Sequence, residues 1–338
     1  MGKEQPRPRT EWRAIGQSVR GAAHLRTGLP NQDAIRWLPA SGVGPPLILA
    51  VSDGHGSAKY FRSHIGAEQA VEAAAWMIQD LMDGQPDPAN LSAIKRTAED
   101  RLPQEIVRRW EEAVAEHVKQ SPLTPDELGT LEQQKGVAAR QAVADNPSLA
   151  YGATVLAVLV AETFILYLQL GDGDILIVDK DGQVGRPLER DARLLANQTT
   201  SLCSTDAWRD VQVRFQALLD PPPVLILLAT DGYANSFVNE AAFLQVGTDI
   251  LEMIRADGLE AVRESLETWL SEASQAGSGD DITLGILCRA DVLSQSTEET
   301  QLAESQLDTS ESQAAGANIS LGPEDEFTVT VTVKRAKK

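Results

Sequence analysis

Three aspartates stand at the edges of apolar, strand-like runs, and residues of this type in this position favour metal chemistry. Asp53 ends the run LILAVSD, Asp231 ends VLILLATD, and Asp281 precedes ITLGILC. A carboxylate at a strand end is held by rigid backbone, and three such ends could meet at one edge of a sheet sandwich. Several carboxylates in one place repel one another strongly unless cations neutralise them. We therefore expect these aspartates to hold divalent cations.

Glycines beside these aspartates strengthen the pattern. Asp53 and Asp231 are each followed by glycine, in VSDGHG and ATDGYA, which lets main chain or a ligand come close. Asp33, in LPNQDAI, and Asp172, in LQLGDGD, are further candidates. A single Asp-Gly after a strand is more often a plain turn, and Asp172-Gly173 alone would be taken for a hairpin loop. Only the combined pattern indicates a site.

The apolar, β-branched runs that must position these residues predict strands. They cover residues 47–53, 153–160, 163–170, 174–179, 224–231 and 282–288. Ala161-Glu162 joins two runs closely enough for a hairpin, and residues 180–182 close another, so antiparallel pairing is expected. Most runs are nearly continuous in apolar character, which predicts sheets that are covered on both faces.

Helices are expected between the strand blocks, from apolar residues at three-and-four spacing. They cover residues 65–81, 103–119, 239–256 and 258–275, and Trp76 and Trp110 should pack in the core. The segment 121–149 is polar and helix-prone, and it could cover the site or only pad the surface. Strands gathered in hairpins, with helices in separate blocks, predict an α+β layered domain.

Composition restricts the partners and the location. The formal net charge of -19 argues against nucleic acid and anionic membranes, which need clustered Lys and Arg, whereas 42% hydrophobic residues can build a sizeable core. The N-terminal residues do not read as a signal peptide, and the apolar runs are too short to cross a bilayer. Cys203 and Cys288 have no metal-type or redox-type spacing, so we expect a cytoplasmic protein.

Composition also suggests the domain boundaries. Residues 1–11 read as an N-terminal extension and residues 12–290 as the main domain. Residues 291–326 are acidic, rich in Ser, Thr and Gln, and lack Lys and Arg, which predicts a disordered tail. Residues 327–338 begin with alternating Thr and Val, a strand pattern that could pair with this domain or with a partner's exposed sheet edge.

Six short motifs occur in a characteristic order between about residue 12 and residue 289. They are NQDA, SDGHGS, GATV, LGDGD, ATDG and GSGDDITL. This set resembles the type 2C metal-dependent serine/threonine protein phosphatases (the PPM family), and its shorter bacterial branch most of all. The resemblance implies a four-layer α-β-β-α sandwich of two antiparallel sheets flanked by helices. It also implies hydrolysis of phosphoserine and phosphothreonine in proteins by a water that bridges two Mn²⁺ or Mg²⁺ ions, and an opposing kinase system.

By motif position, the resemblance implies a role for each metal-binding residue. Asp53 should bridge both ions and the carbonyl of Gly54 should bind one, while Asp231 and Asp281 should hold the other ion. Asp33 should act through bound waters, and Asp172 matches the aspartate that helps bind a third, weaker ion.

Two further residues match the family's catalytic groups. His55 matches the proposed general acid, which protonates the leaving serine or threonine oxygen. Arg26 is the candidate for gripping the phosphate, since guanidinium meets phosphate bidentately. The family places this arginine closer to the following aspartate, so His24 is a rival.

The sequence departs from the family pattern in three places. Gln32 stands where many relatives have glutamate, and Ser57 replaces the second glycine after His-Gly. Asp281 is followed by Ile, where many relatives have asparagine after the aspartate, so Asp280 and Asp281 both remain candidates for one metal ligand.

Two alternatives to an active protein phosphatase stay open. One is a relative that binds phosphoproteins without turnover, and the other is a hydrolase of small phosphoesters. The retained metal aspartates favour an enzyme over the binding module.

Overall fold

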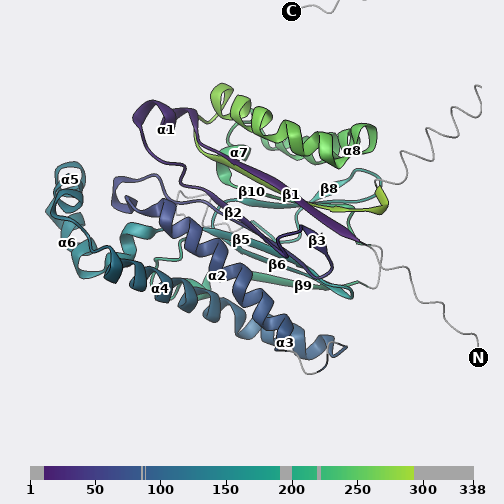
Figure 1. Cartoon of the computed structure of the whole chain (residues 1–338), viewed down its shortest axis with the longest axis horizontal. Helices are drawn as coiled ribbons and strands as arrows, with labels where there is room; N and C mark the ends of the chain where they lie inside the picture. The colour runs from purple at the N-terminus through teal and green to yellow at the C-terminus, as the bar shows by residue number, and fades with distance from the viewer. Residues whose placement is uncertain (1–10, 85–86, 88, 191–199, 219–221, 293–338) are drawn as a thin grey trace, which may run out of the picture. The chain divides into compact units, whose positions relative to one another are not determined.

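The computed structural model describes residues 11–84, 87, 89–190, 200–218 and 222–292. Their strands form two antiparallel sheets that are stacked face to face (Figure 1). The first sheet has the order β3-β1-β11-β10-β7-β8, and the second has the order β2-β4-β5-β6-β9. The strands are β1 (Trp12–Val19), β2 (Ala34–Leu38), β3 (Val43–Gly44), β4 (Leu47–Ser52), β5 (Val155–Val160), β6 (Phe164–Leu170), β7 (Asp174–Val178), β8 (Val184–Gly185), β9 (Gln212–Ala217), β10 (Leu225–Ala229) and β11 (Ile282–Arg289).

Helices cover the outer face of each sheet. In Figure 1, α8 lies over the sheet that contains β1, while α2 and α4 lie over the sheet that contains β5. The helices are α1 (Ala22–Thr27), α2 (Ser63–Asp83), α3 (Leu91–Asp100), α4 (Leu102–Gln120), α5 (Pro125–Lys135), α6 (Val137–Asp145), α7 (Asp231–Ala234) and α8 (Glu240–Ala276). The two helices expected over 239–275 form α8, whose regular backbone is interrupted at Gly258, where φ is +86°.

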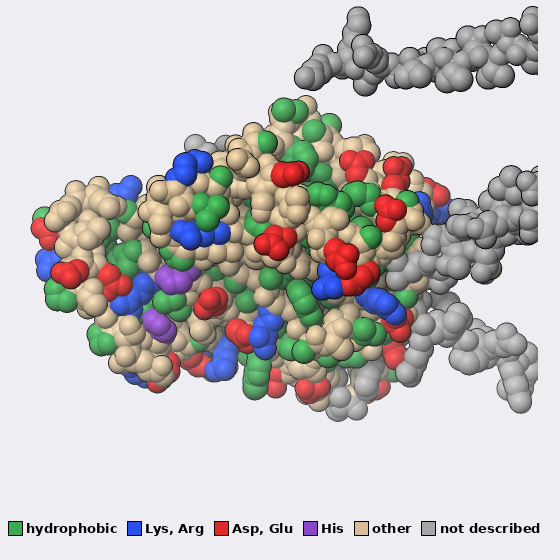
Figure 2. All heavy atoms as spheres, turned by 45° about the horizontal axis from the view of Figure 1, so that its top comes forward, with side chains coloured by type: hydrophobic (Ala, Val, Ile, Leu, Met, Phe, Trp, Pro, Cys, Tyr) green, Lys and Arg blue, Asp and Glu red, His purple; other side chains and the backbone are tan. Residues whose placement is uncertain are grey.

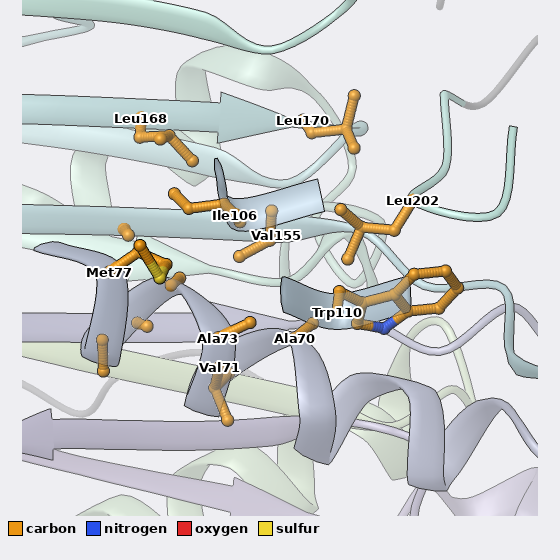
Figure 3. Close-up of a cluster of buried hydrophobic side chains, with 14 of the residues drawn as sticks. Ala70, Val71, Ala73, Met77, Ile106, Trp110, Val155, Leu168, Leu170 and Leu202 are labelled. Carbon is orange, nitrogen blue, oxygen red and sulfur yellow. The ribbon is translucent and has the colours of Figure 1, made fainter. Parts of the chain in front are cut away.

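Three buried apolar clusters lie between these four layers. One lies between the sheets and contains Leu49, Leu156 and Ile226. A second joins the first sheet to α8, and a third joins the second sheet to α2 and α4. Figure 3 shows part of the third cluster, in which Met77 of α2 and Trp110 of α4 face the strands. The expected α-β-β-α sandwich is confirmed.

The predicted hairpins are also confirmed. β5 and β6 pair antiparallel through the turn at Ala161-Glu162, and β7 pairs antiparallel with β8 across residues 180–182. The prediction for Trp76 was wrong: this side chain is 56% exposed, and it stacks under the Arg109 guanidinium instead of entering the core. Trp110 is fully buried, as expected, and its indole N–H donates to the carbonyl of Gly66.

Some expectations fall on residues that the structure does not describe. The extension 1–11 is described only at Glu11, and the tail 291–326 only at Asp291 and Val292, of which Val292 is buried in the cluster under α8. The strand-like segment 327–338 lies outside the described residues. Within the described residues, we find no helix whose length and apolar character would suffice to span a membrane.

Candidate active site

Three carboxylates meet at one end of the sandwich. Asp53 follows β4, Asp172 lies in the turn between β6 and β7, and Asp231 is the first residue of α7, after β10. Each offers a carboxylate oxygen, and these oxygens all lie within 4.8 Å of one another. The strands thus bring together three aspartates from distant parts of the chain.

The loop that carries Asp53 is held tightly on both sides. The backbone N–H of Asp53 donates to the hydroxyl of Thr154 at 3.0 Å, and the carbonyl of Asp53 accepts a hydrogen bond from the N–H of Thr154 at 2.8 Å. The next N–H, of Gly54, donates to the carbonyl of Gln32. A Cβ on Gly54 would lie 2.6 Å from the carbonyl oxygens of Gln32 and Ser63, which explains why the motif needs glycine here.

Asp33 is buried beside this group. Its carboxylate accepts a hydrogen bond from the hydroxyl of Thr230 at 2.7 Å, and Thr230 in turn accepts from the N–H of Thr283. Burial raises the pKa of Asp33 well above its usual value, although hydrogen bonds from both threonines oppose the shift. Asp33 therefore resists ionisation beside Asp231, and its side chain is held in place by the hydroxyl of Thr230.

The electrostatics of the three-aspartate group suit a cation. Burial raises the pKa of Asp53 well above its usual value, and neighbouring carboxylates, Asp33 first, add to the shift. Burial also raises the pKa of Asp231 to about 6; a hydrogen bond with Asp53 opposes this shift, and the charges of Asp172 and Asp280 add to it. These carboxylates resist being ionised at the same time, because a negative charge on one raises the pKa of its neighbours.

This donor set fits a hard divalent cation. All three groups are carboxylates, they lie within the reach of one ion, and their mutual repulsion is of the kind that a divalent ion relieves. Oxygen donors are the ligands that Mg²⁺ and Mn²⁺ prefer, whereas zinc sites favour nitrogen and sulfur.

The neighbouring aspartates Asp280 and Asp281 differ in burial and in hydrogen bonding. The Asp281 carboxylate is buried and accepts hydrogen bonds from the N–H groups of Gly21 and Gln32, both at 2.6 Å. It also lies 2.8 Å from Nδ1 of His24. Asp280 is exposed, and its charge raises the pKa of Asp231. Asp281 is thus held by protein donors, whereas Asp280 is exposed and offers a carboxylate oxygen within 4.8 Å of ligand atoms of both His24 and Asp281.

His55 and the candidate phosphate-binding residues lie in different surroundings. The N–H of His55 donates to the carbonyl of Gly152, and its ring packs edge-on against Tyr60 with the centroids 4.8 Å apart. Burial lowers the pKa of His55, while the charge of Asp172 opposes the shift. Arg26 is exposed on α1, and its rival His24 is buried against Asp281.

Sequence reasoning missed the threonines that support the site. Thr154, Thr230 and Thr283 each bond a motif loop or a buried aspartate. Each belongs to a motif already identified, in GATV, ATDG and DDIT. They stand at different positions relative to the aspartates, so only their presence inside the motifs could have indicated them.

The sequence of this chain is similar to one known protein family. The family model described as protein phosphatase 2C matches residues 20–271. Among curated proteins, none matches the chain significantly.

Solved structures show modest similarity. The Mycobacterium tuberculosis serine/threonine phosphatase PstP/Ppp shares 16% identity over 82% of this chain and 98% of that chain, with a TM-score of 0.49. PppA, a regulatory component of T6SS in Pseudomonas aeruginosa, shares 16% identity over 82% of this chain and 97% of that one, with a TM-score of 0.49. Stp1 of Staphylococcus aureus shares 13% identity over 81% and 94%, also with a TM-score of 0.49. Because the family model spans most of the sequence, this chain belongs to the protein phosphatase 2C family.

Proposed function

We propose that this protein is an active, metal-dependent phosphatase of phosphoserine and phosphothreonine in proteins, and that its centre is the group of Asp53, Asp172 and Asp231. The observation that carries this proposal is the convergence of their carboxylates within 4.8 Å, in a chain that matches the protein phosphatase 2C family model. Asp280 is the fourth proposed ligand in place of Asp281, because its charge acts on Asp231 while the Asp281 carboxylate is occupied by protein donors.

The chemistry requires both activation of water and neutralisation of charge. Two Mn²⁺ or Mg²⁺ ions, when bound, lower the pKa of water and neutralise phosphoryl oxygens, and a third ion beside Asp172 would extend this charge. The chain's own residues position these groups: Asp53 and Gly54 lie on a loop clamped by Thr154 and Gln32, and Asp33 lies behind them.

The remaining catalytic roles are assigned by chemistry. His55 is the proposed proton donor to the leaving serine or threonine oxygen, because an imidazole beside the metal loop can hold and release a proton. Arg26 is the proposed phosphate-binding group, because it is exposed on α1, whereas His24 is bonded to Asp281.

We also propose a cytoplasmic location and phosphoprotein partners. Cys203 and Cys288 are free cysteines, which supports a reducing compartment such as the cytoplasm. Phosphorylated proteins are the proposed substrates, in a signalling system with an opposing serine/threonine kinase. Binding without turnover is disfavoured because the proposed carboxylate ligands are all retained.

Metal removal tests the proposed function. After treatment with EDTA, hydrolysis of a phosphothreonine peptide should fall about a thousandfold, because bound metal supplies several kcal/mol of charge stabilisation. Adding Mn²⁺ or Mg²⁺ in excess should restore the rate. Assays of a phosphopeptide and of small phosphoesters, measured side by side as kcat/KM, separate a protein phosphatase from a small-molecule hydrolase. Full activity in the chelator would refute the mechanism.

The role of His55 predicts a dependence on the leaving group. His55→Ala should slow phosphopeptide hydrolysis about a hundredfold, because the departing alkoxide needs a proton. Hydrolysis of para-nitrophenyl phosphate should fall much less, since its leaving group departs unprotonated. His64→Ala, at the half-buried start of α2, is the matched control and should affect neither substrate. Equal losses on both substrates in His55→Ala would contradict the acid role.

A further inference from the structure

A groove opens beside the metal-binding loop, between that loop and helix α5. Its volume is about 570 Å³, and it is lined by the segment 27–32, the segment 56–61 and one side of α5. Its apolar walls include Leu29, Pro30, Phe61 and Leu131. Figure 1 shows α5 and α6 at the end of the sandwich where α1 and the start of α2 also lie.

The groove is lined by residues that adjoin the loop of the candidate active site. Gln32 and Gly56 line it, and the carbonyl of Gln32 accepts the N–H of Gly54 in the loop that carries Asp53. A peptide that places its phosphorylated residue at Asp53, Asp172 and Asp231 can therefore lay the residues that flank it in the neighbouring groove.

The wall formed by α5 is fixed in place by Arg62. The guanidinium is buried and binds both carboxylate oxygens of Glu127, at 2.7 and 2.8 Å, and it also donates to the carbonyl of Ser121 and the hydroxyl of Tyr151. Glu127 in turn caps α5 through Thr124. This bidentate pair is strong and directional, so the groove is preformed.

The ion pair between Arg62 and Glu127 stays charged at all pH values near neutrality. Burial would raise the pKa of Glu127, but hydrogen bonds from Arg62 and Thr124 outweigh it and lower this pKa to about 2. A carboxylate with a lowered pKa contributes stability above its unfolded value and loses it only as the pH falls towards 2. The groove wall is therefore independent of pH near neutrality.

The lining of the groove defines what it can bind. Asp126 and Glu127 are the ionisable residues among its described lining, and the charge of Glu127 is matched by Arg62. Asp126 is exposed at the first turn of α5, so its charge is open to a ligand. On the face shown in Figure 2, the end that carries α5 and α6 bears acidic, basic and hydrophobic side chains next to one another.

We propose that this groove, called here the α5 groove, binds the substrate chain beside the phosphorylated residue and selects an apolar side chain together with a Lys or Arg. The apolar side chain would pack against Leu29 and Phe61, and the cation would lie near Asp126. An acidic flank is disfavoured by the same carboxylate and by the net charge of -19. This inference rests on the proposed phosphatase function and specifies its substrate class.

Charge reversal at Asp126 tests the electrostatic half of the proposal. The experiment compares two phosphothreonine peptides that share the same apolar residue. They differ only at one flanking position, which is Arg in one peptide and Glu in the other. Asp126→Lys should change the ratio of their kcat/KM values about tenfold in favour of the Glu peptide, chiefly through KM. The change should shrink at high salt, and Asp126→Asn should give an intermediate ratio. Asp145→Lys, an exposed site on α6, makes the same change in net charge and should leave the ratio unaltered.

The apolar half has its own matched pair of variants. Leu29→Ser should lower kcat/KM for the apolar-flanked peptide about fivefold, whereas Leu25→Ser, an exposed leucine of α1 outside the groove lining, should not. Hydrolysis of para-nitrophenyl phosphate reports on the metal centre alone and should be unchanged in all these variants. If the wild type hydrolyses neither substrate, the proposed function fails; if it hydrolyses both and the variants leave peptide preference unchanged, the α5 groove proposal is wrong.

Discussion

Replacing Asp53 by asparagine should lower kcat on a phosphopeptide by about a thousandfold or more at saturating Mn²⁺. In the proposed mechanism the three grouped carboxylates hold the ions, so losing that of Asp53 should remove several kcal/mol of charge stabilisation. The fold should persist, because the backbone of this loop is bonded to Thr154 and Gln32 and does not depend on the Asp53 side chain.

Thermal unfolding separates this effect from a structural defect. In EDTA the Asp53→Asn variant should melt at a higher temperature than the wild type, because it removes one of three mutually repelling carboxylates. With Mn²⁺ the order should reverse, because ion binding stabilises the wild type. Asp100→Asn, at the exposed end of α3, is the control and should change neither activity nor melting. Near-normal turnover in Asp53→Asn would show that Asp53 is not a ligand.

Replacing the adjacent aspartates Asp280 and Asp281 should have different effects. Asp281→Asn should lower the free energy of unfolding by about 1–3 kcal/mol, because one of its bonded N–H groups, from Gly21 or Gln32, would then face an amide NH₂. Asp280→Asn should leave unfolding in EDTA nearly unchanged and weaken Mn²⁺ binding at least about tenfold.

Two measurements decide between these roles. Unfolding in chelator reports on the fold, and titration of activity with Mn²⁺ reports on metal affinity. The assignment would be overturned by the opposite result, in which Asp281→Asn mainly loses metal affinity and Asp280→Asn mainly loses stability.

The predictable part of the fold is the part with continuous apolar character. β4, β5, β6, β10 and β11 are almost wholly buried, so their runs of apolar residues identify them. The two longest strands that were missed mix polar and apolar residues: β1 reads WRAIGQSV, and β9 reads QVRFQA at the edge of its sheet. Their pairing depends on partners far along the chain, which a local pattern does not contain.

The residues of the candidate site also fall into those that the sequence could predict and those that it could not. Asp53, Asp172 and Asp231 could be identified because each stands where a strong strand signal ends and a glycine follows. The different surroundings of Asp280 and Asp281 could not be predicted, because the groups that bind Asp281 belong to residues 249–260 positions earlier. Arg62 was missed for a similar reason, since its partner Glu127 lies 65 residues away.

The pairing of β1 with β11 also determines when the protein can become active during its synthesis. Trp12 pairs with Arg289 and Val19 with Ile282, so β1, the first strand of the described residues, cannot form this pairing until β11, the last of them, has been synthesised. Until then β1 lacks its long neighbour and presents an open edge to other chains. The pocket for the Asp281 carboxylate, formed by Gly21, His24 and Gln32, is incomplete for the same interval. A nascent chain that stops before residue 281 should thus be devoid of phosphatase activity and dependent on chaperones, and final folding should be slow because its decisive contacts are non-local.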